Sequence, residues 1–570
     1  MRDVVIIGSG AGGSALALRL SQAGCDVLVL EKGPRYTRAD YRHDELLFAD
    51  RPGFWTPALE DDPHVVVDHT TGAGHPTLST LGWIARCVGG GTEHMGGTLY
   101  RFHPDDFHMK RRYGAYLEVE DWPYGYDEIE EYYSIAEWEV GISGTAGANP
   151  FEGHRSRPYP MPPVSTHPLA AWIDDAARRL GAHPFPTPRA VNSVPYGGRP
   201  ACSECDFCAG YGCPTGARGS GGSALLVRAE ATGRCEVRPD VMVREVTLGP
   251  DGRAMGCIYL DAHGVEHRES ARVVCVCASA VESARLLLLS TSALFPDGLA
   301  NGSGRVGRHL QLHAGSGGRG RFRRELHPEK GLHHRGSFLG CSVMDYYFLP
   351  PGVSDFPKGG LLRFDMERVN PVVAAQRAAV GADGRLLWGR ALEERLHEHF
   401  HEFREAEFEV FQEFLPNEAT RVELDPAVKD RWGLAAARLH LYEPPHHRAA
   451  GSWVMQRGLD ILEEAGADEL VPRGAGFTVK VMAHGTCRAG VDPATSVVDG
   501  FCRAHEVANL FVVDGSFMPV AAGAPSTLSI LANAFRTADY ILDRARSGDL
   551  APRGHARSAA VAAASPGSAR

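Results

Sequence analysis

The 570-residue sequence has no long hydrophobic run and no long run of basic residues. A membrane-spanning helix needs about 18 or more consecutive apolar residues, and no segment comes close to that length. The net charge is −11, and no run of lysine and arginine is long enough to follow a chain of phosphates. We therefore predict that the chain spans no membrane and that nucleic acid and anionic membranes are not its partners.

A secretory signal is a third missing feature, because a strand pattern begins at residue 3 and leaves no room for one. The 13 cysteines are therefore expected as reduced thiols. The chain is also long enough to bury a large core and to hold several domains. Together these features predict a cytoplasmic protein whose partners are small molecules.

The most informative pattern is a glycine-rich turn that directly follows the apolar residues 4–7. In a dinucleotide-binding turn, one glycine makes the tight bend, one lets the backbone approach a pyrophosphate, and one lets helix and strand pack closely. Gly8, Gly10 and Gly13 have this spacing. Glu31 ends the next apolar run, where a carboxylate can accept hydrogen bonds from a ribose hydroxyl and would repel a 2′-phosphate. The sequence predicts a dinucleotide site, and this turn would serve NAD or FAD.

Two later segments, residues 235–290 and 509–545, also combine strands with a helix. We therefore predict an α/β fold in which a Rossmann-like domain is discontinuous. The region between these parts mixes proline-rich loops, charged helices and aromatic strands, as expected of an inserted α+β substrate domain built on an antiparallel sheet. The expected division is a dinucleotide domain of residues 1–160, 200–320 and 471–545, a substrate domain of residues 161–199 and 321–470, and a disordered tail of residues 546–570.

Four separated blocks of the sequence resemble the glucose-methanol-choline (GMC) family of flavin oxidoreductases. They are the opening turn with Glu31-Lys32-Gly33, residues 88–94, residues 121–133 and residues 484–516. The third block is similar to the branch that contains bacterial sugar dehydrogenases and pyranose oxidases. The resemblance implies FAD rather than NAD, and it implies oxidation of an alcohol by hydride transfer to flavin N5.

The second block is similar to the family's second flavin-contacting loop. Gly89, Gly90 and Gly91 would let backbone amides approach a pyrophosphate or the edge of the flavin, and Thr92 follows them. The alternative is an ordinary turn between core elements. In pyranose and choline oxidases, a histidine at the position of His94 carries a covalent bond to the flavin. We therefore expect His94 to bind FAD, either covalently or as a plain hydrogen-bond donor.

Three further residues are compared with the family pattern near the cofactor. Asp514 and Gly515 resemble a contact to the ribityl chain or the pyrophosphate, and an Asx turn at the end of a strand is the alternative for Asp514. A family glycine that follows a buried strand is replaced by Ser279 in this chain. We expect this serine to restrict the approach of the backbone to FAD.

The catalytic positions depart from the family pattern. GMC enzymes place a histidine near flavin N5 to accept the hydroxyl proton as hydride leaves, commonly with a second histidine or an asparagine. Met482 and Pro525 occupy these two positions here, and neither side chain can accept a proton. His484, two residues past the first position, is the nearest substitute, and we predict it as the general base. The alternative is a histidine bonded to the backbone in a glycine turn.

Four cysteines, Cys202, Cys205, Cys208 and Cys213, are clustered and end at a proline. Their spacing departs by one residue from a ferredoxin pattern, and dense thiolates suit iron–sulfur clusters or zinc. Some flavin-dependent glucose dehydrogenases of the family carry an iron–sulfur cluster in a similar segment. We therefore consider these cysteines candidate iron–sulfur ligands, with zinc, a disulfide or uncoordinated thiols as alternatives.

The resulting hypothesis is an FAD-dependent oxidoreductase of secondary metabolism that oxidises an alcohol group of a carbohydrate-like, cyclitol-like or amino-sugar substrate. Its electron acceptor would be dioxygen or a protein partner. A second hypothesis is a flavin and iron–sulfur electron-transfer subunit that passes electrons to a protein partner. A third, suggested by Met482 and Pro525, is a flavin-binding protein that has lost catalysis.

Overall fold

The computed structural model describes most of the chain. The residues outside this description are 49–54, 56–57, 60, 71–73, 80–84, 115–117, 206, 314, 324–338, 367–369, 382–383, 475–481 and 551–570. Most of the predicted disordered tail therefore lies outside the described residues, while its first residue, Arg546, ends the long helix α11 (Thr527–Arg546). The predicted domain boundaries remain predictions.

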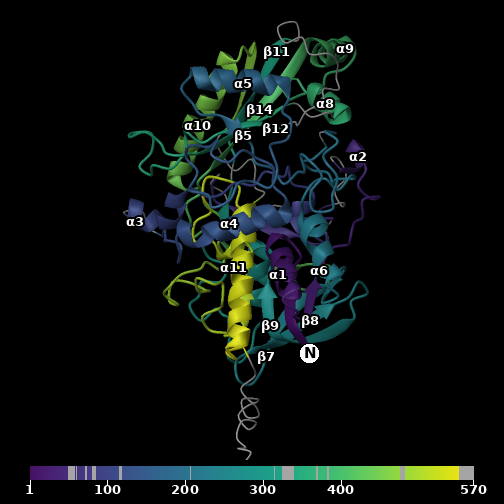
Figure 1. Ribbon diagram of the computed structural model, residues 1–570, viewed down its shortest axis with the longest axis vertical. Coiled ribbons are helices and arrows are strands. Elements are labelled where there is room, and N and C mark those ends of the chain that lie inside the picture. Colours follow the sequence, from purple (N-terminus) through teal and green to yellow (C-terminus); the bar gives the residue numbers. More distant parts are fainter. Residues whose placement is uncertain are drawn as a thin grey trace, which may run out of the picture.

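A seven-stranded sheet forms the lower layer of the molecule (Figure 1). Strands β6, β2, β1, β9 and β19 run parallel, and β8 and β7 continue from β9 as an antiparallel meander. Their bounds are β1 (Arg2–Ile7), β2 (Val27–Leu30), β6 (Cys235–Arg238), β7 (Met242–Leu248), β8 (Ala254–Leu260), β9 (Glu266–Val276) and β19 (Leu510–Val512).

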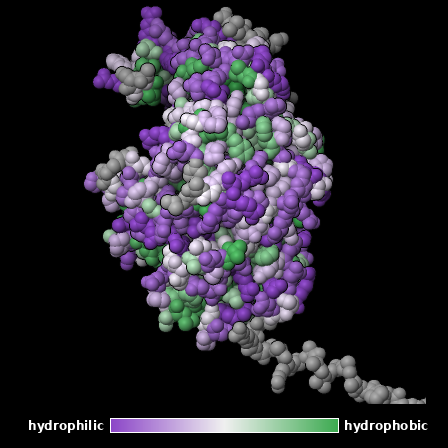
Figure 2. Space-filling model, turned by 90° about the vertical axis from the view of Figure 1, so that its left-hand side faces the viewer, coloured by the Kyte–Doolittle hydropathy of each residue, from purple (hydrophilic) through white to green (hydrophobic). Residues whose placement is uncertain are grey.

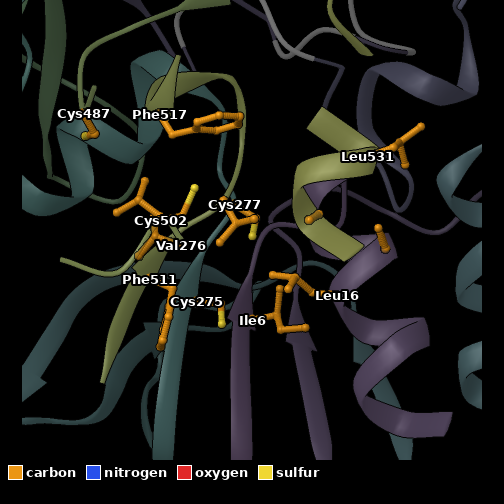
Figure 3. Packing of buried hydrophobic residues seen from close by; sticks show 14 of the residues in the cluster. Ile6, Leu16, Cys275, Val276, Cys277, Cys487, Cys502, Phe511, Phe517 and Leu531 are labelled. Carbon is orange, nitrogen blue, oxygen red and sulfur yellow. The ribbon is translucent and has the colours of Figure 1, made fainter. Parts of the chain in front are cut away.

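The central strands are rich in valine, isoleucine and leucine because helices cover them and both faces are buried. Helix α1 (Ala11–Gln22) packs against α11 and lies over β1. Ile6 of β1 and Leu16 of α1 lie side by side in this core, and Phe511 of β19 lies next to Cys275 of β9 (Figure 3). The carboxyl ends of the parallel strands therefore meet at the edge that faces the upper layer.

A six-stranded antiparallel sheet forms the upper layer, and helices α5 and α10 pack against it (Figure 1). Strand β14 alternates buried and less buried residues because one of its faces packs against these helices, whereas β12 and β13 are buried along their whole length. In spatial order they are β17 (Glu469–Arg473), β11 (Gly317–Arg323), β14 (Phe403–Gln412), β13 (Gly360–Met366), β12 (Leu339–Val343) and β5 (Phe185–Pro186). The helices are α5 (Pro168–Arg179) and α10 (Pro445–Glu464).

Two smaller sheets and several shorter helices complete the described fold. One sheet pairs β15 (Arg421–Lys429), β16 (Ala435–Leu441), β3 (His64–Asp68) and β4 (Pro76–Ser79), and the other pairs β10 (Gln311–Leu312) with β18 (Ala483–His484). The remaining α-helices are α2 (Glu45–Phe48), α3 (Met109–Tyr113), α4 (Tyr126–Val140), α6 (Val227–Ala231), α7 (Ala280–Leu289), α8 (Pro371–Ala378) and α9 (Arg390–His397).

The predicted fold class is confirmed, because a parallel sheet flanked by helices lies below an antiparallel sheet. The face drawn in Figure 2 is mostly hydrophilic, and its hydrophobic side chains are scattered in small groups. Among the described residues, no helix combines the length and the apolar character needed to span a bilayer.

Candidate cofactor and substrate site

A cavity of about 480 Å³ lies where the edge of the parallel sheet meets the upper layer. Segments that are far apart in the sequence form its wall. These are the opening turn with residues 30–32, the loop at 90–98, residues 241–243 at the start of β7, residues 277–289 at α7, residues 482–484, residues 514–515, residues 525–530, and three side chains of β13 and β14. The elongated lining suits a long ligand with chemically different ends.

Two glycines of the opening turn, Gly8 and Gly12, are held so closely against other backbone that no larger residue can replace them. Gly8 has a φ of +100°, and a Cβ atom there would lie 2.3 Å from the carbonyl oxygen of Cys277. A Cβ on Gly12 would lie 1.8 Å from the carbonyl oxygen of Val513, so the turn contacts β19 from the other end of the chain. At Gly10, in contrast, nothing would lie within 4 Å of a Cβ, which leaves space for a ligand in front of the helix α1.

Gly13 and Gly90 also have close backbone neighbours. A Cβ on Gly13 would lie 2.0 Å from the carbonyl oxygen of Gly8, in agreement with the role in helix packing that its spacing predicts. A Cβ on Gly90 would lie 3.0 Å from the Cα atom of Gly10. The two predicted glycine loops are thus brought together, and both line the cavity.

Glu31 lines the cavity and fastens the opening turn. Its Oε2 accepts hydrogen bonds from the amide of Ser9 at 3.1 Å and from Ser9 Oγ at 2.6 Å, and its Oε1 accepts one from the amide of Gly33 at 2.9 Å. Burial raises the pKa of Glu31, although these donors oppose that effect. An ionised carboxylate has about four acceptor positions, so one remains for a ribose hydroxyl.

Asp514 also lines the cavity, but protein donors use both of its oxygens. Oδ1 accepts from the amide and Oγ of Ser516, and Oδ2 accepts from the amide of Ser279 and from Ser283 Oγ, at distances of 2.5–2.9 Å. The bonds from Ser516 are those of an Asx turn, and the bonds from Ser279 and Ser283 tie the end of β19 to the start of α7. Gly515 lines the cavity beside Asp514, and its contact with the cofactor stays a prediction.

Ser279 has the backbone geometry of a glycine. Its φ is +78° and its ψ is 163°, a combination that residues other than glycine rarely adopt. Its amide nevertheless donates to Asp514, and its position lines the cavity. The positive φ angle explains why the family pattern has a glycine at this position. Ser279 adopts the same angle in this chain, so the turn is strained.

The second glycine loop begins with two residues in left-handed conformation, Gly89 and Gly90, with φ of +94° and +57°. Thr92 Oγ1 donates to the carbonyl of Gly89 at 2.6 Å and accepts from the amide of Gly221 at 2.8 Å, so its hydroxyl holds the loop together. Gly91 and Thr92 line the cavity. Gly89 does not, and its left-handed conformation gives it a role in the turn itself.

His94 lines the cavity at the end of this loop, with its ring 5.3 Å from the ring of Trp55. Desolvation, with a smaller contribution from Arg218, lowers the pKa of His94 to about 3. The imidazole is therefore neutral at physiological pH, which leaves it a nitrogen lone pair. A neutral imidazole in this position can donate one hydrogen bond or form a bond to carbon.

Met482, His484 and Pro525 all line the cavity. The side chain of His484 is 1% exposed, and its Nε2 lies 2.5 Å from Ser526 Oγ. Ser526 also lines the cavity. The two residues that replace the family pattern are therefore accompanied by a histidine and a serine that are bonded to each other.

The environment of His484 keeps its imidazole neutral. Burial lowers the pKa of His484 well below its ordinary value, and His313, whose ring lies 5.0 Å away, lowers it further. His313 is itself buried, and its Nε2 bonds to the carbonyl of Ala522 at 2.7 Å. His484 Nδ1 has no hydrogen-bond partner in the part of the chain that the structure describes. A neutral imidazole whose Nε2 is bonded to a hydroxyl at the cavity wall can accept a proton through that hydroxyl.

The structure does not support the predicted iron–sulfur site at the four clustered cysteines. The structure leaves them as free thiols, and its described residues contain no group of three or more His, Cys, Asp and Glu side chains placed to hold a metal. Cys202 Sγ accepts a hydrogen bond from the amide of Glu204, and Cys213 Sγ lies 3.4 Å from Thr215 Oγ1, so these thiols contact their own turns instead of a shared centre. Burial raises the pKa of Cys202 to about 12, which favours the protonated thiol.

Sequence reasoning missed the polar residues that the upper sheet contributes. Arg363 of β13 and Glu409 of β14 line the cavity together with Phe411. The alternating pattern of residues 403–412 indicates a strand with two different faces, but it does not show that one of those faces meets the cavity. Lys32, Glu282 and Arg285 form a buried ionic group at the opposite end, and they too were not predicted.

Comparison with known proteins decides the family. Two models described as GMC oxidoreductase match residues 5–315 and 416–534. This chain is a GMC oxidoreductase. It is 33% identical to paromamine 6′-oxidase of Streptomyces fradiae, over 97% of this chain and 92% of that protein. It is 31% identical to 6‴-hydroxyparomomycin C oxidase of Streptomyces lividus, over 95% and 91% of the two chains.

Other similar proteins are named for different substrates. The chain is 31% identical to 2-methyl-1,2-propanediol dehydrogenase of Mycolicibacterium austroafricanum, over 95% of each chain. Among solved structures, pyridoxine 4-oxidase of Mesorbium loti has a TM-score of 0.61 at 19% identity and covers 95% of this chain and 99% of that one. This likeness supports the fold.

GMC oxidoreductases bind FAD, and the cavity of this GMC oxidoreductase fits that cofactor. Its dinucleotide end has open space at Gly10 in front of the N-terminus of α1, where a pyrophosphate is stabilised by backbone amides and the helix dipole. Its other end reaches His94, His484 and the upper sheet. The enzyme is thus an FAD-dependent oxidoreductase that acts on alcohol groups, as its relatives are named.

Proposed function

We propose that this GMC oxidoreductase oxidises an alcohol group of an amino-sugar or related carbohydrate to a carbonyl. The observation that carries this proposal is one continuous cavity that joins the dinucleotide turn to the His484–Ser526 pair and to polar residues of the upper sheet. The names of the two Streptomyces relatives favour amino-sugars over simple alcohols. When bound, FAD would supply the hydride acceptor at flavin N5.

His484 and Ser526 would handle the proton of the substrate hydroxyl. Ser526 Oγ would accept this proton from the substrate and donate its own to His484 Nε2, because the two atoms are already in hydrogen-bond contact. Since burial keeps His484 neutral, its nitrogen is available as the acceptor. Met482 and Pro525 present apolar surface next to this pair, which would exclude water from the transfer.

Flavin reduction by a sugar tests the proposed function directly. The purified holoenzyme is mixed under anaerobic conditions with paromamine, the compound in the name of the Streptomyces fradiae relative, and the flavin absorbance is followed. Bleaching of the flavin is expected. Absence of bleaching with paromamine, with a neutral glucoside and with a cyclitol would leave the enzyme without the proposed activity and would favour the flavin-binding protein that has lost catalysis.

A second measurement distinguishes dioxygen from a protein as the electron acceptor. Admission of air to the reduced enzyme releases hydrogen peroxide if dioxygen is the acceptor, which the oxidase names of the relatives favour. Slow reoxidation without peroxide would instead indicate a protein acceptor. The electron-transfer alternative depended on an iron–sulfur cluster, and the positions of the four cysteines do not support one.

Attachment of FAD to His94 is a further part of the proposal. The imidazole lines the cavity and is neutral, which is the form that can bond to the flavin. Flavin that remains with the acid-precipitated protein, and is released in His94→Ala, would support covalent attachment. Release from the wild-type protein would show that His94 is a hydrogen-bonding residue.

A further inference from the structure

A row of charged residues crosses the six-stranded sheet beside the cavity. Arg363 of β13 is paired with Glu409 of β14, which is paired with Gly317 of β11, which is paired with Arg473 of β17. Residues that are directly opposite across strands place their side chains on the same face. Arg363 and Glu409 line the cavity, as does Phe411, which lies two residues further along β14 and therefore on the same face.

The guanidinium of Arg363 is held by protein acceptors. Its Nε donates to Asp365 Oδ1 at 3.0 Å, and its Nη2 donates to Asp365 Oδ2 at 2.8 Å and to Glu409 Oε2 at 2.6 Å. Its Nη1 donates to Thr98 Oγ1 at 3.3 Å. This network fixes the position of Glu409 and uses most of the donors of Arg363, so the arginine acts here as a support for the carboxylate.

Glu409 keeps one oxygen for a ligand. Arg363 occupies Oε2, while no donor among the described residues reaches Oε1, and the side chain is 28% exposed in the cavity wall. Gly317, which is paired with Glu409 on the neighbouring strand, has no side chain that could cover the carboxylate of Glu409. Arg473 reaches over Gly317, where its Nη2 would lie 2.9 Å from a Cβ, but it makes no ion pair with Glu409 within the described structure. Arg473 is also absent from the cavity wall.

The other carboxylates of the cavity wall have partners of their own. Glu31 is bound by Ser9 and the amide of Gly33, Asp514 by four serine donors, and Glu282 by Lys32 and Arg285. The spare acceptor of Glu409 is instead contributed by the sheet that faces His484. A substrate at this end would meet a carboxylate on one side and the proton-accepting pair on the other.

We propose that Oε1 of Glu409 binds an ammonium group of the substrate, and that the substrate is consequently an amine-bearing sugar alcohol. This inference rests on the proposed function. A hydrogen bond between two charged groups is stronger than one between a carboxylate and a hydroxyl, so the amine is favoured over a neutral sugar. A sugar acid would be repelled by the same carboxylate. The site thus distinguishes three classes of carbohydrate by charge.

The test compares a pair of substrates that differ at one position. Flavin reduction is measured with methyl 2-amino-2-deoxy-α-D-glucopyranoside and with methyl α-D-glucopyranoside, at a pH where the amine is protonated. In Glu409→Gln we expect the ratio of kcat/KM for amine over neutral sugar to fall at least about tenfold. The control is Glu405→Gln on the same strand, because Glu405 pairs with Arg319 but does not line the cavity, and its ratio should equal that of the wild type.

Equilibrium binding to the wild-type holoenzyme gives a readout that needs neither turnover nor a variant. The probes are the 6-deoxy form of the amino-glucoside and its N-acetyl derivative, which has lost the charge, and calorimetry should give at least about tenfold weaker binding for the acetylated probe. Equal binding of the two probes, or an unchanged substrate ratio in Glu409→Gln, overturns the assignment of Glu409. If paromamine, a cyclitol and both of these sugars leave the wild-type flavin oxidised, the proposed function fails, whereas equal binding of the two probes to an enzyme that does reduce its flavin overturns the assignment of Glu409 alone.

Discussion

Replacement of His484 is the sharpest test of how this enzyme moves a proton. His484→Asn removes the imidazole and keeps a polar group of similar size next to Ser526 Oγ. A positioned general base contributes about 10²- to 10⁴-fold to the rate, so we expect the rate of flavin reduction to fall by a factor in this range. Ser526→Ala leaves Nε2 of a buried imidazole without its 2.5 Å partner. Because the proposed transfer passes through this hydroxyl, we expect the rate of flavin reduction to fall in the same range as in His484→Asn.

The pH profile adds a prediction whose sign follows from the pKa. Proton acceptance requires neutral imidazole, and burial lowers the pKa of His484 well below its ordinary value, with His313 adding to the effect. The neutral form therefore persists at acid pH. We expect the rate of flavin reduction to show no histidine inflection near about pH 6.5, where an exposed imidazole would become protonated and inactive.

The assay is anaerobic stopped-flow reduction of the flavin at saturating substrate, which isolates this step from reoxidation. His505 provides a matched control, because its Nε2 lies 2.8 Å from Ser496 Oγ in a second histidine–serine pair outside the cavity wall. His505→Asn should reduce its flavin at the wild-type rate. If His484→Asn, with full flavin content, loses less than about tenfold, the assignment of His484 as the base is wrong.

Three further predictions concern stability and cofactor retention. Ser279→Gly should raise the free energy of unfolding by about 1 kcal/mol, because removal of the strain at φ +78° outweighs the entropy of glycine, and a lower melting temperature would contradict this. Gly12→Ala places a Cβ 1.8 Å from Val513 O, so we expect a purified protein with less flavin per chain by absorbance; full flavin content would refute the close contact. Burial raises the pKa of Glu413 to about 7, even beside Lys358, so stability should be lost as pH rises through about 7, and Glu413→Gln should remove this loss in urea unfolding measured from pH 5 to 8. The same pH dependence in both proteins would place the titration elsewhere.

The sequence predicts the dinucleotide turn well because its residues are neighbours in the chain. Gly8, Gly10 and Gly13 have local roles that spacing can express, and the structure shows close contacts of the backbone at Gly8 and Gly13 and open space at Gly10. The need for glycine at position 12 could not be predicted, because it comes from Val513 at the other end of the chain. Spacing alone contains no information about such a partner.

The rest of the site shows why side-chain direction limits sequence analysis. The cysteine spacing shows that four thiols are near one another along the chain, but Cys202 and Cys213 make contacts within their own turns, and the structure does not support the predicted metal site. The role of His484 stays a prediction, and its contact with Ser526 depends on two segments that are distant in sequence. Glu409 was not predicted because alternation assigns it to a face of a strand and not to a cavity.

The contact between Gly12 and Val513 has a consequence for the order of events during synthesis. The opening turn packs against Val513, which directly follows β19, and this strand emerges from the ribosome about 500 residues later than the turn. At a translation rate of about 5–20 residues per second, the N-terminal turn waits roughly half a minute or more for this strand. Capture of FAD is then an event of the finished chain, and a chain interrupted before residue 510 would leave the ribosome without its flavin.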